Sequence, residues 1–210
     1  MTRILLLIGC LLTGLIVVSS FIVDEGLQVD QKTPVWKVLA ELNEPMPNHV
    51  VNSNIEGVSV ERGKDLVLKG FTIDAKGNKT KRVSKHFECT ACHNMVKETP
   101  NLQLADDPDA RLAYAKKNRL PFLQGSPLFG IVNRTSFYNG DYDKKYGKLV
   151  EPTRNNLREA IQLCAIECSQ GRKLDDWEVE SILAYLWTLE LTMDDLNLGE
   201  QSWKKFNSAY

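Results

Sequence analysis

Two cysteines and a histidine stand together in Cys89-Thr-Ala-Cys92-His93, and their spacing constrains the fold more than any other feature of the chain. The two residues between the cysteines set the reach between their sulfur atoms, and the histidine follows the second cysteine directly. This is the pattern at which haem c is attached, because each sulfur adds to one vinyl group and the histidine binds the iron. The motif therefore predicts one covalent haem c, with Cys89 and Cys92 attaching it and His93 binding the metal.

Other interpretations of the cysteine pair fit the sequence less well. A thioredoxin-like Cys-x-x-Cys lies in a βαβ unit, and no such pattern is visible. A zinc site needs a second pair of ligands, for which only Cys164 and Cys168 are available, at a loose spacing. A plain disulfide between Cys89 and Cys92 is compatible with an oxidising compartment. We favour haem because the motif lies behind an export segment.

That export segment is an uncharged apolar run from Ile4 to Val23. About twenty apolar residues are enough to cross a bilayer, and the run is longer than the roughly 7–15 residues of a signal-peptide core. We interpret residues 1–23 as a signal peptide or membrane anchor, with a slight preference for an uncleaved anchor. Either places the rest of the chain on the periplasmic side of the membrane, anchored or secreted. A net charge of −1 without a long basic block gives no indication of nucleic-acid binding.

The chain after the export segment divides into a proline-punctuated tether (24–56), a haem domain (57–191) and a C-terminal tail (192–210). The tether is expected to pack loosely on the domain. Helical spacing, capping residues and charge placement predict a mainly α fold with long loops. The expected helices cover 36–42, 58–68, 107–120, 155–169 and 176–191, and a turn at 75–78 indicates a small hairpin. This regular structure is thin for a domain of such size, which agrees with a haem filling the core.

Three features of the haem domain carry a family resemblance. A helix ends at Gly70 before the attachment motif, the stretch GSPLFGIVNR begins at Gly125, and an aromatic helix ILAYLWTLEL closes the domain. In these features the chain resembles the class I c-type cytochromes, which implies a helical fold around one haem. The resemblance implies that the carbonyl of Pro127 accepts a hydrogen bond from His93 and that Arg134 reaches a haem propionate. From the residues alone, Pro127 is equally an ordinary turn proline and Arg134 a solvated surface arginine.

A second similarity is local and begins at Leu163, in the stretch LCAIECSQGRKL. Cys164, Gly171 and Leu174 match the pattern of the thiosulfate dehydrogenase and SoxA-type cytochromes, which this stretch resembles. The resemblance implies that Cys164 is the second axial ligand of the haem iron and that thiosulfate or a related sulfur compound is the substrate.

The same stretch departs from that pattern where substrate binding is concerned. Two arginines of the pattern are replaced by Ala160 and Glu167, and its methionine is replaced by Ser169. Thiosulfate is a dianion, and a site for it needs cations or aligned donors. Arg158 and Arg172 lie nearby in the sequence and are candidates to compensate. The chain also has one attachment motif, so no second haem is available to take electrons away.

The ligand opposite His93 stays open between Cys164, Cys168 and Met193, since iron accepts both thiolate and thioether sulfur. We expect an exported monohaem c-type cytochrome that carries electrons in a respiratory or periplasmic chain. Its partners are then redox proteins or a membrane respiratory complex, with residues 4–23 in contact with the membrane. The alternative is a thiosulfate dehydrogenase-like, sulfur-oxidising haem enzyme with a cysteine-ligated iron. An electron carrier is favoured because the arginines of the enzyme pattern are missing.

Overall fold

The computed structural model describes residues 29–104, 107–120, 125–138 and 142–197. Within these ranges the chain is mainly helical and has no β-strand, which confirms the predicted mainly α class. The α-helices are α1 (Val35–Glu41), α2 (Val60–Lys69), α3 (Pro108–Asn118), α4 (Tyr142–Tyr146), α5 (Leu157–Leu163) and α6 (Asp176–Trp187). Short 3₁₀ segments cover Cys89–Ala91, Leu102–Leu104, Ile131–Asn133, Gly147–Thr153 and Met193–Leu196, and a π-turn covers Cys164–Cys168.

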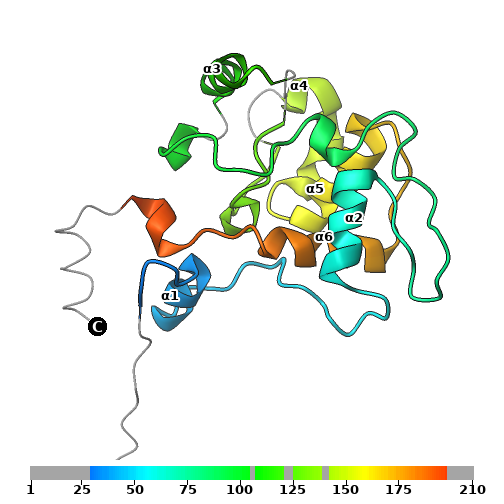
Figure 1. The fold of residues 1–210 in the computed structure, drawn as a ribbon, viewed down its shortest axis with the longest axis horizontal. Coiled ribbons are helices and arrows are strands. Elements are labelled where there is room, and N and C mark those ends of the chain that lie inside the picture. The colour runs from blue at the N-terminus through cyan, green and yellow to red at the C-terminus, as the bar shows by residue number, and fades with distance from the viewer. Residues whose placement is uncertain (1–28, 105–106, 121–124, 139–141, 198–210) are drawn as a thin grey trace, which may run out of the picture.

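The centre of the fold is the close crossing of α2 and α6, which Figure 1 shows side by side with α5 next to them. The Ser59 hydroxyl caps α2 by accepting a hydrogen bond from the backbone N–H of Arg62, and the helix ends at Gly70 with a φ of 71°. At the crossing, a Cβ on Gly63 would lie 1.8 Å from the carbonyl oxygen of Ser181. Glycine at this position therefore allows a helix–helix approach that any side chain would block.

α6 carries the largest share of the core. A capping box starts the helix: the Asp175 side chain and the Glu178 side chain each bind the other residue's backbone N–H. The buried face of α6 packs against α2 and α5, as its helical spacing predicts. This core includes Val179, Ile182, Leu183 and Leu186 from α6, Leu66 and Val67 from α2, and Leu157 and Ala160 from α5.

Three other predicted elements are confirmed in the described ranges. Asp107 caps α3 by accepting a hydrogen bond from the N–H of Ala110, with the basic residues in its last turn. The turn at 75–78 closes a small hairpin through an isolated bridge between Ile73 and Lys79. The predicted helix at 155–169 exists, but its second half leaves the α-helical pattern. The N–H of Ser169 bonds to the carbonyl of Cys164 at 2.9 Å, which is the i→i+5 pairing of a π-turn.

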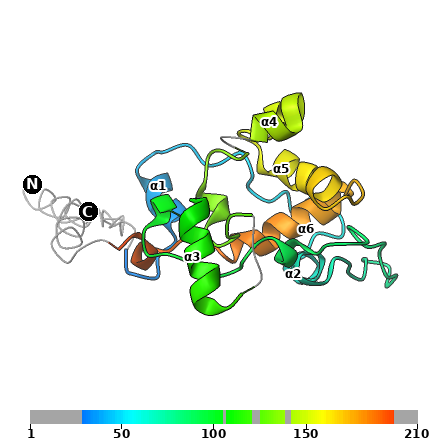
Figure 2. The same ribbon diagram turned by 90° about the horizontal axis from the view of Figure 1, so that it is seen from above.

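The described part of the tether is bound to the domain, and this corrects the expectation that it packs loosely. The N–H of Val35 donates to the carbonyl of Leu191 at 2.9 Å, and the N–H of Met193 donates to the carbonyl of Thr33 at 3.0 Å. The rings of Trp36 and Trp187 meet edge to face with centroids 6.2 Å apart. Figures 1 and 2 both show α1 beside the chain that leaves α6. Residues 29–35 and 191–197 thus form one layer at the same end of the molecule.

Across the described ranges, we find no helix with the length and apolarity to span a membrane. The predicted export segment at residues 4–23 lies outside these ranges, as does most of the predicted tail.

Candidate functional site

A cavity of about 990 Å³ opens beside the crossing of α2 and α6. This is at the upper end of the roughly 300–1,000 Å³ found for ligand pockets. Its apolar lining comes from the core: Leu66, Val67, Val83, Leu128, Ile131, Phe137, Leu157, Ile161, Leu174, Ile182 and Leu186. The cysteines and the histidine of the wall are Cys89, Cys92, His93, Cys164 and Cys168. The helical core therefore encloses a space for a bulky apolar group, with soft ligand atoms around it.

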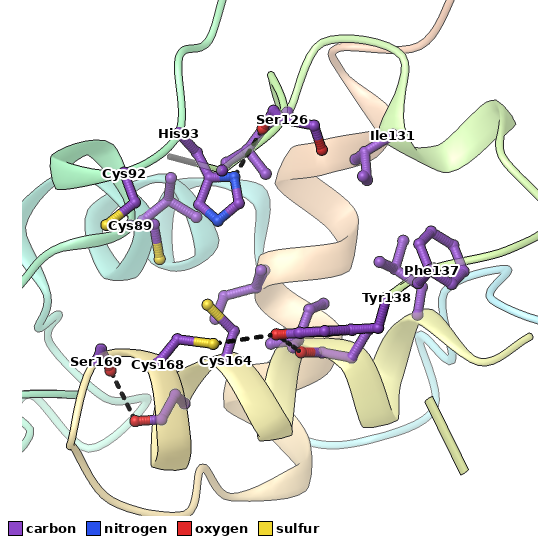
Figure 3. A pocket seen from close by; sticks show the side chains of 18 of the residues that line it. Cys89, Cys92, His93, Ser126, Ile131, Phe137, Tyr138, Cys164, Cys168 and Ser169 are labelled. Atoms are coloured by element: carbon purple, nitrogen blue, oxygen red, sulfur yellow. Dashed lines mark hydrogen bonds between the residues drawn. The ribbon is translucent and has the colours of Figure 1, made fainter. Parts of the chain in front are cut away.

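The attachment motif lies along one wall as a single 3₁₀ turn. The N–H of Cys92 and the N–H of His93 both bond to the carbonyl of Cys89, at 3.2 and 2.9 Å. A distant part of the chain is bound to the motif, since the N–H of Gly125 donates to the carbonyl of Cys92 at 3.0 Å. All three side chains of the predicted motif consequently line the cavity, and Figure 3 shows them on the same side of it.

His93 is oriented by one backbone hydrogen bond. Its Nδ1 lies 2.7 Å from the carbonyl oxygen of Ser126, which can only accept, so Nδ1 carries the proton and Nε2 keeps its lone pair. Burial lowers the pKa of the imidazole, against the opposing effect of this bond, and keeps the ring neutral. The family resemblance implied that the accepting carbonyl is that of Pro127. The structure places it one residue earlier, while Pro127 itself is buried.

Gly125 makes room for the imidazole. A Cβ on this residue would lie 2.3 Å from Cε1, 2.5 Å from Nδ1 and 2.8 Å from Nε2 of His93. These distances are far below ordinary van der Waals contact, so the ring position and the glycine depend on each other. The sequence analysis recorded the glycine only as the start of a family-like stretch and gave no reason for it.

Cys164 and Cys168 lie on the wall opposite His93. Figure 3 shows the Cys164 sulfur pointing up into the space below the imidazole and the Cys168 sulfur pointing along the wall. Both thiols are free in the structure. Residues four positions apart lie about one helical turn apart on the same face, so both cysteines of the π-turn reach this wall.

The hydroxyl groups of two tyrosines meet at the Cys168 sulfur. The Tyr138 oxygen lies 3.4 Å from Cys168 Sγ, and the Tyr146 oxygen lies 3.3 Å from it. The interaction with the Cys164 thiol, together with these hydroxyls, lowers the pKa of Cys168. The same interaction and burial raise the pKa of Cys164. The sequence did not predict that either hydroxyl reaches Cys168, and Tyr146 lies in a stretch that had only the composition of a loop.

Three basic side chains reach the cavity: Arg111, Arg134 and Lys145. Arg111 is buried and pairs with Glu98 at 2.7 Å, with both side chains at most 5% exposed. Arg134 donates to the Ser126 hydroxyl at 3.0 Å, so it lies beside the residue that orients His93. Of the three, only Arg134 was predicted from sequence. Arg111 lies within the charged pattern of a surface-like helix and gave no local signal.

Several other candidates for the iron lie elsewhere. Met193 is buried where the chain after α6 pairs with Thr33, and it does not line the cavity. Met46 is 42% exposed, and Met95 packs against the outside of the core. His49 is buried with Nε2 2.7 Å from the carbonyl of Val132. Cys164 and Cys168 are therefore the sulfur atoms that face His93, and the Met193 alternative is not supported.

The two arginines considered as substitutes for the missing thiosulfate site are engaged in ion pairs. Arg158 donates to the Glu180 carboxylate at 2.5 Å and to the carbonyl of Val50 at 2.7 Å. Arg172 makes a two-pronged pair with the buried Glu178, at 2.5 and 2.6 Å. Neither arginine lines the cavity. Their role is to hold α6 to its neighbours.

The residues of the cavity fit a haem. The volume and the apolar lining suit a porphyrin, and two thiols and a neutral imidazole share one side of it. The cradle at Gly125 leaves no room for a side chain where the imidazole stands. Arg134, which lines the cavity beside Ser126, suits the carboxylates that a haem carries. Within the described ranges, no group of three or more His, Cys, Asp or Glu side chains is gathered around a metal position.

Comparison of the chain with protein-family models, with curated proteins and with solved structures gave no match in any of the three.

Proposed function

We propose that the protein is an exported c-type cytochrome, class I-like in fold, that binds one covalent haem c and carries electrons in a respiratory or periplasmic chain. The observation that carries the proposal is that Cys89, Cys92 and His93 open into one large apolar cavity. A three-residue motif arises by chance in many chains, but chance does not supply a matching cavity at the centre of the core. The close crossing of α2 and α6 around this cavity supports the class I-like fold.

In this function the chain's own residues bind, orient and screen the cofactor. The thiols of Cys89 and Cys92 form two thioether bonds, and Nε2 of His93 binds the iron. The bond from Nδ1 to the Ser126 carbonyl fixes the ring and strengthens Nε2 as a donor. A haem held by these residues would supply reversible one-electron chemistry. The apolar wall excludes water, which keeps the site from reorganising when an electron arrives or leaves.

The ligand from the opposite side is Cys164 in this proposal. Its sulfur points toward His93, whereas no described methionine lines the cavity. An anionic sulfur stabilises ferric iron and lowers the reduction potential. Arg134 lies at the cavity with positive charge for a propionate, whereas the charge of Arg111 is balanced by Glu98.

Location and partners follow from the segment at 4–23 and from the surface. We propose that this segment takes the domain across the membrane and holds it on the periplasmic side. The exposed lysines of the run 76–85 stand directly before the attachment motif. Positive charge next to a cofactor edge favours docking of an acidic redox protein or a membrane respiratory complex.

A sulfur-oxidising enzyme is the second candidate, and one observation favours it. Cys164 and Lys145 share the cavity, so a thiolate-ligated iron and a cation lie in one space. The ion pairs of Arg158 and Arg172 count against it, because they remove the two cations nearest to the expected dianion site. We rank the electron carrier first for this reason.

The test is expression together with a haem-attachment system, followed by acid–acetone extraction and mass spectrometry. We expect the pigment to stay on the protein and the mass to rise by one haem. Cys89→Ala or Cys92→Ala each removes one thioether, while the matched control Cys164→Ser leaves both in place. Pigment that comes free from the wild-type protein would refute the proposal. Steady tetrathionate formation from thiosulfate with an artificial acceptor would reverse the ranking of the two functions.

A further inference from the structure

We propose that Tyr138 and Tyr146 are positioning residues that hold the Cys168 sulfur on the cavity wall, so that Cys164 alone stands opposite His93. This inference rests on the proposed haem site. It concerns a question that the attachment motif does not answer, namely how a cavity with two neighbouring thiols on one wall offers a single ligand.

The Cys168 thiol has fewer hydrogen atoms than hydrogen-bond partners. A thiol carries one hydrogen, yet two tyrosine oxygens lie 3.4 and 3.3 Å from the sulfur. The thiol can serve only one of them as a donor, so at least one hydroxyl donates to the sulfur. The Tyr138 oxygen also lies 3.5 Å from the carbonyl of Ala160 on α5. The sulfur is thus bound from two directions to side chains that are themselves attached to the fold.

The backbone of Tyr138 has a φ of 54°. A bulky residue in the left-handed region is an outlier, and such strain persists only where the surroundings impose it. Here the imposed conformation carries the phenol into the cavity wall and its hydroxyl to Cys168. An ordinary loop conformation at this position would not need to be strained.

The backbone next to Cys168 is held by contacts at Ser169 and Gly171. The π-turn ends where the Ser84 hydroxyl donates to the carbonyl of Ser169 at 2.6 Å. Next to it, a Cβ on Gly171 would lie 2.1 Å from the carbonyl of Val83, so the chain is in close contact there. The Cys168 backbone is therefore held in place, and the direction of its side chain depends on the tyrosines.

The three tyrosines of this region also support one another. The ring of Tyr142 stacks on that of Tyr146 with centroids 6.2 Å apart, and it meets the ring of Tyr138 edge to face at 5.0 Å. The hydrogen bonds to Cys168 come from the first and last members of the trio. The middle ring holds the other two in place. Tyr142→Phe is therefore a matched control, because it keeps the ring and leaves both bonds to the sulfur.

The experiment asks whether releasing Cys168 lets it replace Cys164. In ferric, haem-loaded protein, Cys164→Ser should abolish the thiolate-type EPR signal, because the tyrosines keep Cys168 away from the iron. Adding Tyr138→Phe and Tyr146→Phe to Cys164→Ser should bring a thiolate signal back. A further Cys168→Ser change should remove it again. Tyr142→Phe in the Cys164→Ser background should restore nothing.

A second experiment keeps Cys164 and changes only the two tyrosines. It still gives a result if the variants with three or four substitutions fold poorly. Tyr138→Phe with Tyr146→Phe alone should turn one set of thiolate g-values into two, as both sulfurs compete for the iron. The inference is overturned if Cys164→Ser retains the signal, if releasing Cys168 restores none, or if the double variant keeps a single set. A wild-type protein with covalent haem but no thiolate signal also overturns it. Absence of covalent haem refutes the proposed function itself.

Discussion

Replacing Gly125 by alanine tests the seat of His93 directly. The new Cβ would lie 2.3 Å from Cε1 of the imidazole, where ordinary contact begins near 3.4 Å, so the ring or the chain must move by about 1 Å. A shift of that size stretches the 2.7 Å bond between Nδ1 and the Ser126 carbonyl beyond hydrogen-bonding distance. The lost bond costs about 1 kcal/mol and the overpacking about 1–3 kcal/mol. We therefore expect a loss of roughly 2–4 kcal/mol in the free energy of unfolding.

The assay is thermal unfolding of the haem-loaded protein, read together with its ferric visible spectrum. For a chain of this size the loss corresponds to a fall in Tm of roughly 5–15 °C. The spectrum should change as well, because the displaced ring binds the iron less well. Gly147→Ala is the control, since a Cβ there meets nothing within 4 Å and its cost is limited to the strain of a positive φ. If Gly125→Ala matched wild type in both stability and spectrum, the structural account of His93 would be wrong.

Three further predictions concern the core and its ion pairs. Gly63→Ala should lower the free energy of unfolding by about 3 kcal/mol or more, because its Cβ would lie 1.8 Å from the Ser181 carbonyl and the helices must separate. The control is Lys64→Ala, on the exposed side of α2, which should change the free energy of unfolding by no more than about 0.5 kcal/mol in the same thermal melt. Arg111→Leu should lower the free energy of chemical unfolding by about 3–5 kcal/mol, because it leaves Glu98 buried without its cation. Adding Glu98→Leu should recover much of this loss, and an Arg111→Leu variant as stable as wild type would contradict the prediction. Burial alone would raise the pKa of Glu180, but hydrogen bonds from Arg158 and the N–H of Asn52 outweigh it and lower this pKa below its ordinary 4.5. The ionised Glu180 therefore stabilises the fold above pH 4.5, and this stabilisation is lost as the pH falls. Urea unfolding between about pH 7 and pH 3 should therefore show a shallower acid loss in Glu180→Gln than in wild type, and equal slopes would refute the assignment.

Local signals in the sequence were sufficient to predict the helices that hold the site. Ser59 and Gly70 mark the ends of α2, and the acidic pair at Asp175 starts α6, because capping acts through neighbouring residues. The structure brings Cys89, Cys92 and His93 of the motif to one cavity, while the attachment of haem to them stays a prediction. The family resemblance also pointed to the region around Pro127, and missed the accepting carbonyl by a single residue. Loop register is set by tertiary contacts, which a motif does not record.

What the sequence could not supply was the partner of each charged or sulfur-bearing side chain. Arg158 and Arg172 looked available for an anion until the fold paired them with glutamates of α6. The π-turn at Cys164 has no sequence signature, because it differs from an α-helix by one residue in the hydrogen-bond register. The contact of Tyr138 and Tyr146 with Cys168 had no local signal in the sequence. The contacts of Arg158 with Glu180 and of Tyr138 with Cys168 join residues 22 and 30 positions apart, which local patterns do not record.

The crossing of α2 with α6 also sets an order in time. The core cannot close until Ser181 reaches Gly63, and Ser181 is synthesised roughly 90 residues after His93. At about 5–20 residues per second, that interval lasts roughly 5–20 s. For all of that time Cys89 and Cys92 belong to an unfinished chain whose thiols are open to solvent. Access to Cys89 and Cys92 is therefore sterically unrestricted until α6 packs on α2 and closes the core.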